Sequence, residues 1–276
     1  PMKKILVAFD GTFFSEGALE YAFNLSTNNG DLIVGVFIED LSYVGYATLF
    51  GEDYFTFNDA LLNKLEHEDD TKFSLSIARF ETLCKASGKN YQVHLNKGVP
   101  VNELVRESLF ADLIVIGYRT FFSNIIGEAS FLKDILQEAA CPVMAVPDQC
   151  AAFKSILLTF DGKPSSVYAI KQFTQLLPDV YNGLDVVLLS ITKSKEEKLE
   201  YSQLMQEYLA VHYREVKFEN FAGEANEAIL SIAESMKSPL IIMGAFGRNV
   251  VSRFFSRSTA SKILKHQSLP IFVCHK

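Results

Sequence analysis

The chain contains the same series of segments twice. The stretch "KKILVAFDGTFFSEGALEYAFNL", which begins at Lys3, recurs as "KSILLTFDGKPSSVYAIKQFTQL", which begins at Lys154. In both copies an apolar run ends in Asp-Gly, and a turn containing serine leads into apolar residues at helical spacing. Later segments pair in the same order, since "EAACPVMAV" matches "KHQSLPIFV". A repeat of this length predicts two domains of one fold, over residues 2–149 and 152–276.

Within each half, short runs rich in β-branched residues alternate with longer stretches whose apolar residues recur every three to four positions, which is typical of βαβ units. We therefore predict an α/β fold of two tandem Rossmann-like domains, each a five-stranded parallel sheet with helices on both faces. The strands are expected over 4–9, 32–38, 91–95, 112–117 and 143–147, then 155–160, 185–191, 214–219, 239–243 and 270–274. The helices are expected over 15–28, 58–87, 101–109 and 129–139, then 164–177, 195–211, 224–236 and 258–267.

The two halves differ in length between strands two and three. Asp10 and Gly117 lie 107 positions apart, and Asp161 and Gly244 lie 83 apart, so the first half holds an insertion of 24 residues. Its aromatic part, residues 41–60, either covers a ligand as a lid or packs on its neighbour. The sequence leaves both interpretations open.

The last strand of each half, "VMAV" at 143–146 and "IFVC" at 271–274, is apolar and belongs at a sheet edge. An exposed edge of this kind promotes association. We therefore predict that these strands cover one another, which joins the halves as an intrachain pseudo-two-fold dimer. A further homodimer is left open.

Candidate site residues follow strands one and four of each half. Doubly wound sheets bind ligands at the carboxyl ends of their strands, where the topology changes direction. Asp10 and Asp161 end the first strand of each half. Each carboxylate either accepts hydrogen bonds from a ligand or caps the turn of an ordinary Asp-Gly dipeptide.

In the second half, Gly244 and Gly247 follow strand four, where glycines let backbone N–H groups approach an anion. Ser258 then stands at the start of the last helix, whose N-terminus favours negative charge. Arg248, Arg253 and Arg257 add positive charge nearby. This pattern is typical of a phosphate-binding loop, although a turn, a helix cap and solvated arginines would explain the same residues.

The order of these features resembles the universal stress protein family. Asp161, the loop Gly244-Ala245-Phe246-Gly247, nine further residues and Arg257-Ser258 follow the family's pattern, and the resemblance covers both halves. It implies a tandem universal stress protein that binds ATP, with or without Mg²⁺. Residue by residue, it implicates Asp161, Val187 or its neighbour, Gly244, Gly247, Ser258 and Thr259 in nucleotide binding.

Departures from the pattern separate the two halves. Arg257 replaces a glycine, so its side chain either contacts a phosphate or occupies the phosphate position. In the first half Asp10, Gly117 and Ser130 correspond to the site, but Thr120 replaces the second glycine and Glu128 places an acid nearby. We therefore expect ATP to bind chiefly in the second domain.

Three classes of function follow. The first is a stress-response or signalling protein that binds ATP without efficient turnover, as a weak ATPase at most, because no general base or metal-binding cluster stands near the loop. The alternative is a nucleotide-independent interaction or scaffold protein with degenerate sites. The third is an enzyme such as an ATP pyrophosphatase or a flavin electron-transfer subunit. The pyrophosphatases need a glycine-rich loop after strand one, which "DGTFFS" and "DGKPSS" lack.

Composition narrows the expected partners and location. The net charge is -7, with no run of like charges that would favour nucleic acid or an anionic membrane surface. The apolar runs are strand-sized, so we expect a soluble cytoplasmic protein. The four cysteines show no C-x-x-C spacing and the five histidines no metal-binding spacing, so no metal site is expected.

Overall fold

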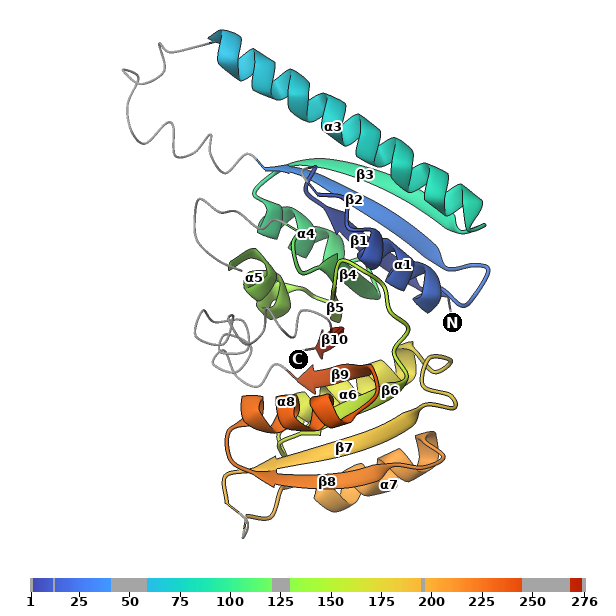
Figure 1. Ribbon diagram of the computed structural model, residues 1–276, viewed down its shortest axis with the longest axis vertical. Coiled ribbons are helices and arrows are strands. Elements are labelled where there is room, and N and C mark those ends of the chain that lie inside the picture. The colour runs from blue at the N-terminus through green and yellow to red at the C-terminus, as the bar shows by residue number, and fades with distance from the viewer. Residues whose placement is uncertain are drawn as a thin grey trace, which may run out of the picture.

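The computed structural model describes residues 2–11, 13–40, 59–120, 130–194, 197–244 and 269–274. The strands of the first half are β1 (Lys4–Phe9), β2 (Leu32–Asp40), β3 (Asn90–Gly98), β4 (Leu113–Gly117) and β5 (Val143–Val146). Those of the second half are β6 (Ser155–Phe160), β7 (Asp185–Thr192), β8 (Lys217–Ala222), β9 (Pro239–Gly244) and β10 (Ile271–Cys274). They form one ten-stranded sheet in the order β3-β2-β1-β4-β5-β10-β9-β6-β7-β8 (Figure 1). Within each half all pairs are parallel, which confirms the predicted α/β fold.

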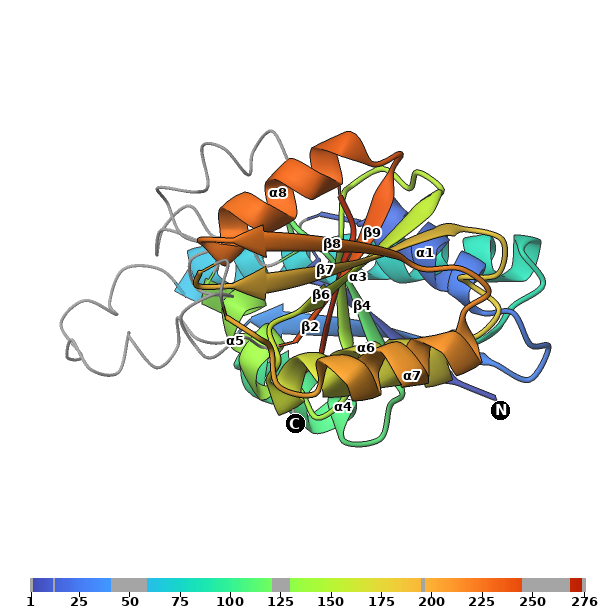
Figure 2. The same cartoon turned by 90° about the horizontal axis from the view of Figure 1, so that it is seen from below.

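Helices cover both faces of the sheet. One face is packed by α1 (Glu16–Leu25), α3 (Asp59–Ala86), α6 (Pro164–Leu176) and α7 (Ser202–His212). The other is packed by α4 (Pro100–Ser108), α5 (Ser130–Glu138) and α8 (Ala225–Ser235). Figure 2 shows this layering in the second half, where α8 lies on one side of β7 and β8 while α6 and α7 lie on the other. Equivalent helices of the two halves therefore pack into the same hydrophobic cluster.

The central strands are buried along their whole length because both of their faces are covered. Every residue of β4, β6 and β9 is buried. In the first half, Phe9, Phe37 and Phe80 pack ring against ring, with centroids 4.8 to 5.9 Å apart. Burying one such aromatic side chain stabilises the fold by roughly 1.5–3 kcal/mol. Because side chains on both faces of the central strands are buried, these strands are uninterrupted apolar runs in the sequence.

The two halves are joined through their last strands. β5 and β10 pair antiparallel, with Val143 opposite Val273 and Ala145 opposite Ile271. The pairing continues the sheet across the middle of the molecule (Figure 1). The prediction that each half covers the other's edge strand is confirmed.

Hydrogen bonds from side chains of the first half reinforce this junction. The Tyr118 hydroxyl donates to the Leu269 carbonyl at 2.7 Å, and the Tyr21 hydroxyl donates to the Ala151 carbonyl at 2.8 Å. Burial raises the pKa of the Tyr118 hydroxyl, which keeps it protonated as a donor. The halves therefore share both backbone and side-chain contacts.

In the first half, α1 ends at Leu25 and β3 continues to Gly98, each three residues from its expected end. The helix expected over 258–267 lies outside the described residues. Two elements of the second half also differ from the prediction by three residues or more. The helix expected over 195–211 begins only at Ser202, after Tyr201 in a left-handed conformation with φ 61°. The strand expected over 214–219 is β8, which runs from Lys217 to Ala222 because its ladder with β7 sets its bounds. Both errors fall where the chain is polar and little buried.

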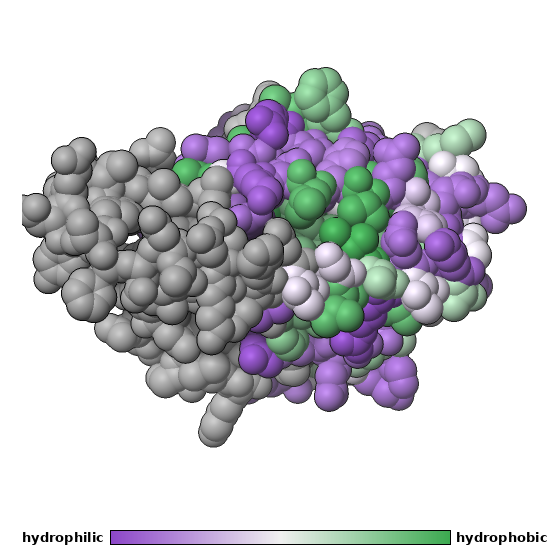
Figure 3. Space-filling view, turned by 90° about the horizontal axis from the view of Figure 1, so that it is seen from above, coloured by the Kyte–Doolittle hydropathy of each residue, from purple (hydrophilic) through white to green (hydrophobic). Residues whose placement is uncertain are grey.

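The insertion of the first half lies between β2 and β3, in the same segment of the chain as α3. Phe73 and Phe80 on this helix are buried against the sheet, so its described C-terminal part packs on the domain. The aromatic segment, apart from residues 59 and 60, lies outside the described residues, and the lid interpretation stays untested. Figure 3 views the molecule from the α3 end and shows a small hydrophobic patch within a mostly hydrophilic surface. Leu75 of α3 and Leu95 of β3 are exposed apolar side chains of this half.

Candidate functional site

Asp161 and Gly244 meet at the carboxyl edge of two adjacent strands. β6 and β9 pair in parallel with Leu158 opposite Ile242, so Phe160, which precedes Asp161, is level with Gly244. In the first half Val7 lies opposite Val115, so Phe9, which precedes Asp10, is level with Gly117. The topology therefore brings the Asp and Gly of each half together, as the repeat predicts.

The Asp161 carboxylate is engaged by its own turn. Its Oδ1 accepts a hydrogen bond from the Lys163 backbone N–H at 3.1 Å, and its Oδ2 lies 3.1 Å from the Lys163 ammonium. The Asp161 side chain is only 11% exposed, whereas that of Lys163 is 68% exposed. Gly162 between them has φ +76°, a conformation that glycine adopts without strain. Asp161 is thus a turn residue, and among the described residues its second oxygen is held by the flexible Lys163 side chain alone.

Asp10 has a similar local role in the first half. Its Oδ1 accepts a hydrogen bond from the Phe13 backbone N–H at 2.9 Å. A Cβ at Gly11 would lie 2.5 Å from the ring of Phe73, so the insertion helix α3 packs directly on this turn. In the second half, a Cβ at Gly162 would meet Leu199 Cβ and Glu200 N at 3.2 Å. The two turns are alike, but different elements cover them.

Gly117 and Gly244 have a packing role that the sequence did not indicate. A Cβ at Gly244 would lie 2.6 Å from the carbonyl carbon and oxygen of Ser165, in the first turn of α6. A Cβ at Gly117 would lie 2.3 Å from Oγ of Ser15, the N-cap of α1. In both halves the helix after strand one starts against the end of strand four. These glycines are therefore required by the fold, whether or not a ligand binds beside them.

Val187 is not brought to this edge. It pairs with Leu157 near the amino end of β7, is buried, and belongs to the α8 side of the core. Phe160 pairs with Ser190, so the β7 residue level with Asp161 is Ile191. Four residues of strand separate Val187 from that position, a distance of about 13 Å. The strand-two residue beside Asp161 is therefore Ile191, not Val187.

A cavity of about 250 Å³ opens beside Asp161. Its walls come from the turn after β6, the end of β7 and its connection, and the start of α8. The residues lining it are Asp161, Lys163, Ile191, Thr192, Lys193, Glu197, Gly223, Glu224 and Ala225. The sequence prediction contained only Asp161 of these. Two of the other lining residues could have been noticed in the sequence: Gly223, which follows β8, and Lys163 in "FDGK". Neither indicates a cavity until the order of the strands is known.

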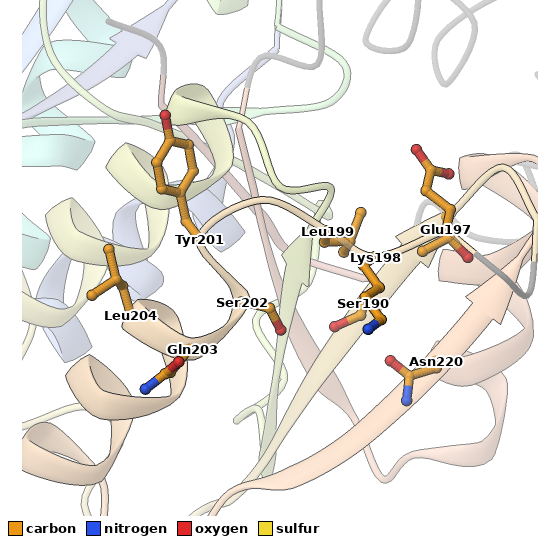
Figure 4. Close-up of a pocket in the computed structure, with 10 residues that line it drawn as sticks. Ser190, Glu197, Lys198, Leu199, Tyr201, Ser202, Gln203, Leu204 and Asn220 are labelled. Atoms are coloured by element: carbon orange, nitrogen blue, oxygen red, sulfur yellow. The ribbon is translucent and has the colours of Figure 1, made fainter.

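A second cavity, of about 550 Å³, lies on the α7 side of β7 and β8. Figure 4 shows Ser190 and Asn220 on the strands, with Ser202 and Gln203 on the first turn of α7. The late start of α7 leaves this end of the sheet without a helix above it. Thr192 and Glu197 line both cavities, so the end of β7 separates them.

Several predicted site residues lie outside the described part of the chain. These are Gly247, Arg257, Ser258, Thr259, Arg248 and Arg253 of the second half, with Glu128 of the first. Ser130 begins α5, which agrees with a helix starting there, although its side chain is not described. Thr120 is buried, and its backbone N–H donates to the Gly117 carbonyl at 3.0 Å. Its hydroxyl has no hydrogen-bond partner among the described residues.

The described residues show neither a metal-binding cluster nor a membrane-spanning helix. They contain no group of three His, Cys, Asp or Glu side chains placed to hold a metal ion. Among them, no helix has the length and apolar character needed to span a membrane.

Comparison with known proteins assigns the chain to a family. The sequence model described as "Universal stress protein family" matches residues 1–147 and 152–275. The chain is 24% identical over 288 residues to Universal stress protein Slr1230 of Synechocystis sp., across 98% of this chain and 99% of that protein. Its fold is similar to the crystal structure of a universal stress protein from Archaeoglobus fulgidus, with a TM-score of 0.70 and 18% identity, over 99% of this chain and 96% of that one. Both matches extend over the two halves. The chain belongs to the universal stress protein family, with two copies of the family's domain in tandem.

Proposed function

We propose that the chain is a stress-response protein that binds ATP at the carboxyl edge of its second domain, without efficient turnover. The observation that carries this proposal is the cavity beside Asp161, at the carboxyl ends of β6, β7 and β8. Asp161 follows β6, and the topology of the second domain changes direction between β6 and its other neighbour, β9. Among the described residues this cavity combines three carboxylates, two lysines and the N-terminus of α8.

The chemistry of the walls suits different parts of a nucleotide. The Asp161 Oδ2 and the Thr192 hydroxyl can bond to ribose or adenine groups. The N-terminus of α8, an 11-residue helix that begins at Ala225, favours negative charge. At about 250 Å³ the cavity is smaller than typical small-molecule sites, at roughly 300–1,000 Å³. It therefore accommodates part of the nucleotide, and the sequence pattern assigns the phosphates to Gly247, Ser258 and Thr259.

Binding without turnover follows from the same groups. Asp161 Oδ1 accepts the Lys163 backbone N–H, a bond that belongs to the turn, and a carboxylate that accepts such a bond is a weaker general base. We expect hydrolysis to be slow at most, and ATP, with or without Mg²⁺, to stay intact in the site.

A nucleotide-independent interaction protein is the second candidate. It is favoured by the finding that Asp10 and Asp161 serve their own turns, while Gly117 and Gly244 are needed for helix packing. These four residues would persist in a domain that had lost its ligand. They therefore support the family fold more strongly than they support binding.

Calorimetric titration with ATP and Mg²⁺ separates the two candidates. A Gly247→Val variant places a branched side chain in the predicted phosphate loop, and we expect it to abolish the heat of binding seen with the wild type. The matched variant is Thr120→Val at the corresponding position of the first half, which keeps the side-chain shape and should leave binding unchanged. Binding that is equal in Gly247→Val and wild type would reject the loop, and no binding by the wild type would favour the interaction protein.

A further inference from the structure

Lys163 occupies the oxygen of Asp161 that a ligand needs. Asp161 Oδ1 accepts the Lys163 backbone N–H, a bond that belongs to the turn itself and is kept as long as the turn is folded. Asp161 Oδ2 is held by the Lys163 ammonium at 3.1 Å. A ligand donor that approaches Asp161 Oδ2 therefore competes with the Lys163 ammonium for this oxygen.

The ammonium can leave without disturbing the fold. The Lys163 side chain is largely exposed, and exposed ion pairs contribute little to stability because water screens them. Lys163 lies at the start of α6 and makes no side-chain cap there, so the helix does not depend on its side chain. Its stem has four carbons, which lets the charge move by several ångströms while the backbone stays in place.

The charges around the cavity indicate where the ammonium goes. The cavity is lined by three acidic residues, Asp161, Glu197 and Glu224, and by two basic ones, Lys163 and Lys193. A nucleoside adds no charge to this set, but a triphosphate adds several negative charges. The described part of the site, which has more acids than bases, opposes a triphosphate unless a cation turns toward the phosphates. Lys163 lines this cavity, so its ammonium is available for this once it is released from Asp161.

We propose that Lys163 exchanges the Asp161 carboxylate for the phosphates of the bound nucleotide, and that this exchange makes the second-domain site selective for charged nucleotides over nucleosides. The inference rests on the proposed function, since it concerns the same site. Lys163 is then a specificity-determining residue: it shields Asp161 in the absence of ligand and neutralises phosphate in its presence.

The sequence of the first half supports a difference between the domains at this position. The turn reads "FDGK" in the second half and "FDGT" in the first, so Thr12 corresponds to Lys163 and carries no charge. Thr12 lies outside the described residues, so this is a difference in sequence. A lysine confined to the second half agrees with ATP binding chiefly in that half.

The test compares ATP with adenosine by calorimetry in four proteins: the wild type, Lys163→Met, Lys163→Arg and the control Lys198→Met. Lys198 lines the cavity on the α7 side of β7 and not the cavity beside Asp161. Lys163→Met should weaken ATP binding about tenfold, the scale of one lost charge-assisted contact. It should leave adenosine binding unchanged or stronger, because Asp161 Oδ2 is then open. Lys163→Arg should preserve the preference for ATP, and Lys198→Met should behave as wild type.

The outcomes separate this inference from the proposed function. If the wild type binds ATP but Lys163→Met changes ATP and adenosine affinity by the same factor, the exchange is wrong and ATP binding stands. If the variant binds both ligands more tightly, Lys163 merely blocks the site and the inference is also wrong. If the wild type binds neither ligand, both proposals fail. Circular dichroism of each variant shows whether it is folded before its affinity is compared.

Discussion

Replacing Gly244 with alanine tests whether this glycine serves the fold. The new Cβ would lie 2.6 Å from the Ser165 carbonyl carbon and oxygen and 2.7 Å from the Ser166 nitrogen. All three are backbone atoms, so the end of β9 and the first turn of α6 must separate by about 0.8 Å to reach ordinary van der Waals contact. Overpacking of this kind costs about 1–3 kcal/mol, and we expect the upper part of that range. For a chain of this size the corresponding fall in melting temperature is roughly 3–5 °C.

Urea unfolding followed by circular dichroism measures this loss. Gly183→Ala is the matched control, because Gly183 has φ +79° but nothing within 4 Å of its ideal Cβ. It carries only the backbone penalty, about 1 kcal/mol. If Gly244→Ala unfolds at the same urea concentration as the wild type, the close approach of β9 and α6 is wrong. If it is stable yet loses ATP binding, Gly244 serves the ligand and not the fold.

Two further predictions concern the junction and the buried thiols. Tyr118→Phe removes the hydrogen bond from the first half to the Leu269 carbonyl. We expect it to lower the free energy of unfolding, measured in urea, by roughly 1–2 kcal/mol. An unchanged free energy would show that this bond does not stabilise the junction. Burial raises the pKa of the Cys84 and Cys141 thiols from 9.0 to about 12. The unfolded chain therefore releases these protons at lower pH than the folded chain does. The contribution of each buried thiol to the free energy of unfolding is fully present below about pH 9 and is lost as the pH rises toward 12. The loss is at most about 1.4 kcal/mol per pH unit for each thiol. Urea unfolding between about pH 8 and pH 10 checks this, and Cys84→Ala should reduce the slope.

Much of the fold could be predicted from the sequence because local and long-range signals agree. β1 and β6 have the predicted bounds, since each is a continuous apolar run that ends in an Asp-Gly turn. The repeat gave the number of domains, and the apolar last strands indicated that β5 and β10 cover one another. The strand inferences depend on burial, which is visible in the sequence as runs of apolar residues.

The errors occur where burial is weak. Residues 193–200, "KSKEEKLE", have high helix propensity but almost no apolar face, and a helix needs such a face to be held by packing. The helix therefore starts only at Ser202, where Met205 and Leu209 reach the core. This delay also opens the larger cavity on the α7 side of β7, which no sequence pattern indicated.

The candidate site was harder to predict than the fold. The sequence gives the order of residues along one strand. It does not show which residue of the next strand lies opposite each of them, because that depends on the hydrogen-bond register. That register makes Ile191, not Val187, the neighbour of Asp161. The side-chain partner of Asp161 could not be inferred either, because Lys163 belongs to a turn whose shape is set by Gly162.

The central claim is that the second domain holds the nucleotide, and the stoichiometry of ATP binding tests it most directly. Asp161→Asn keeps the oxygen that accepts the Lys163 N–H but loses the charge, and Asp10→Asn makes the same change in the first domain. By calorimetry we predict one ATP per chain for the wild type and for Asp10→Asn, and a large loss of affinity for Asp161→Asn. Unchanged binding by Asp161→Asn, together with loss of binding by Asp10→Asn, would contradict the claim.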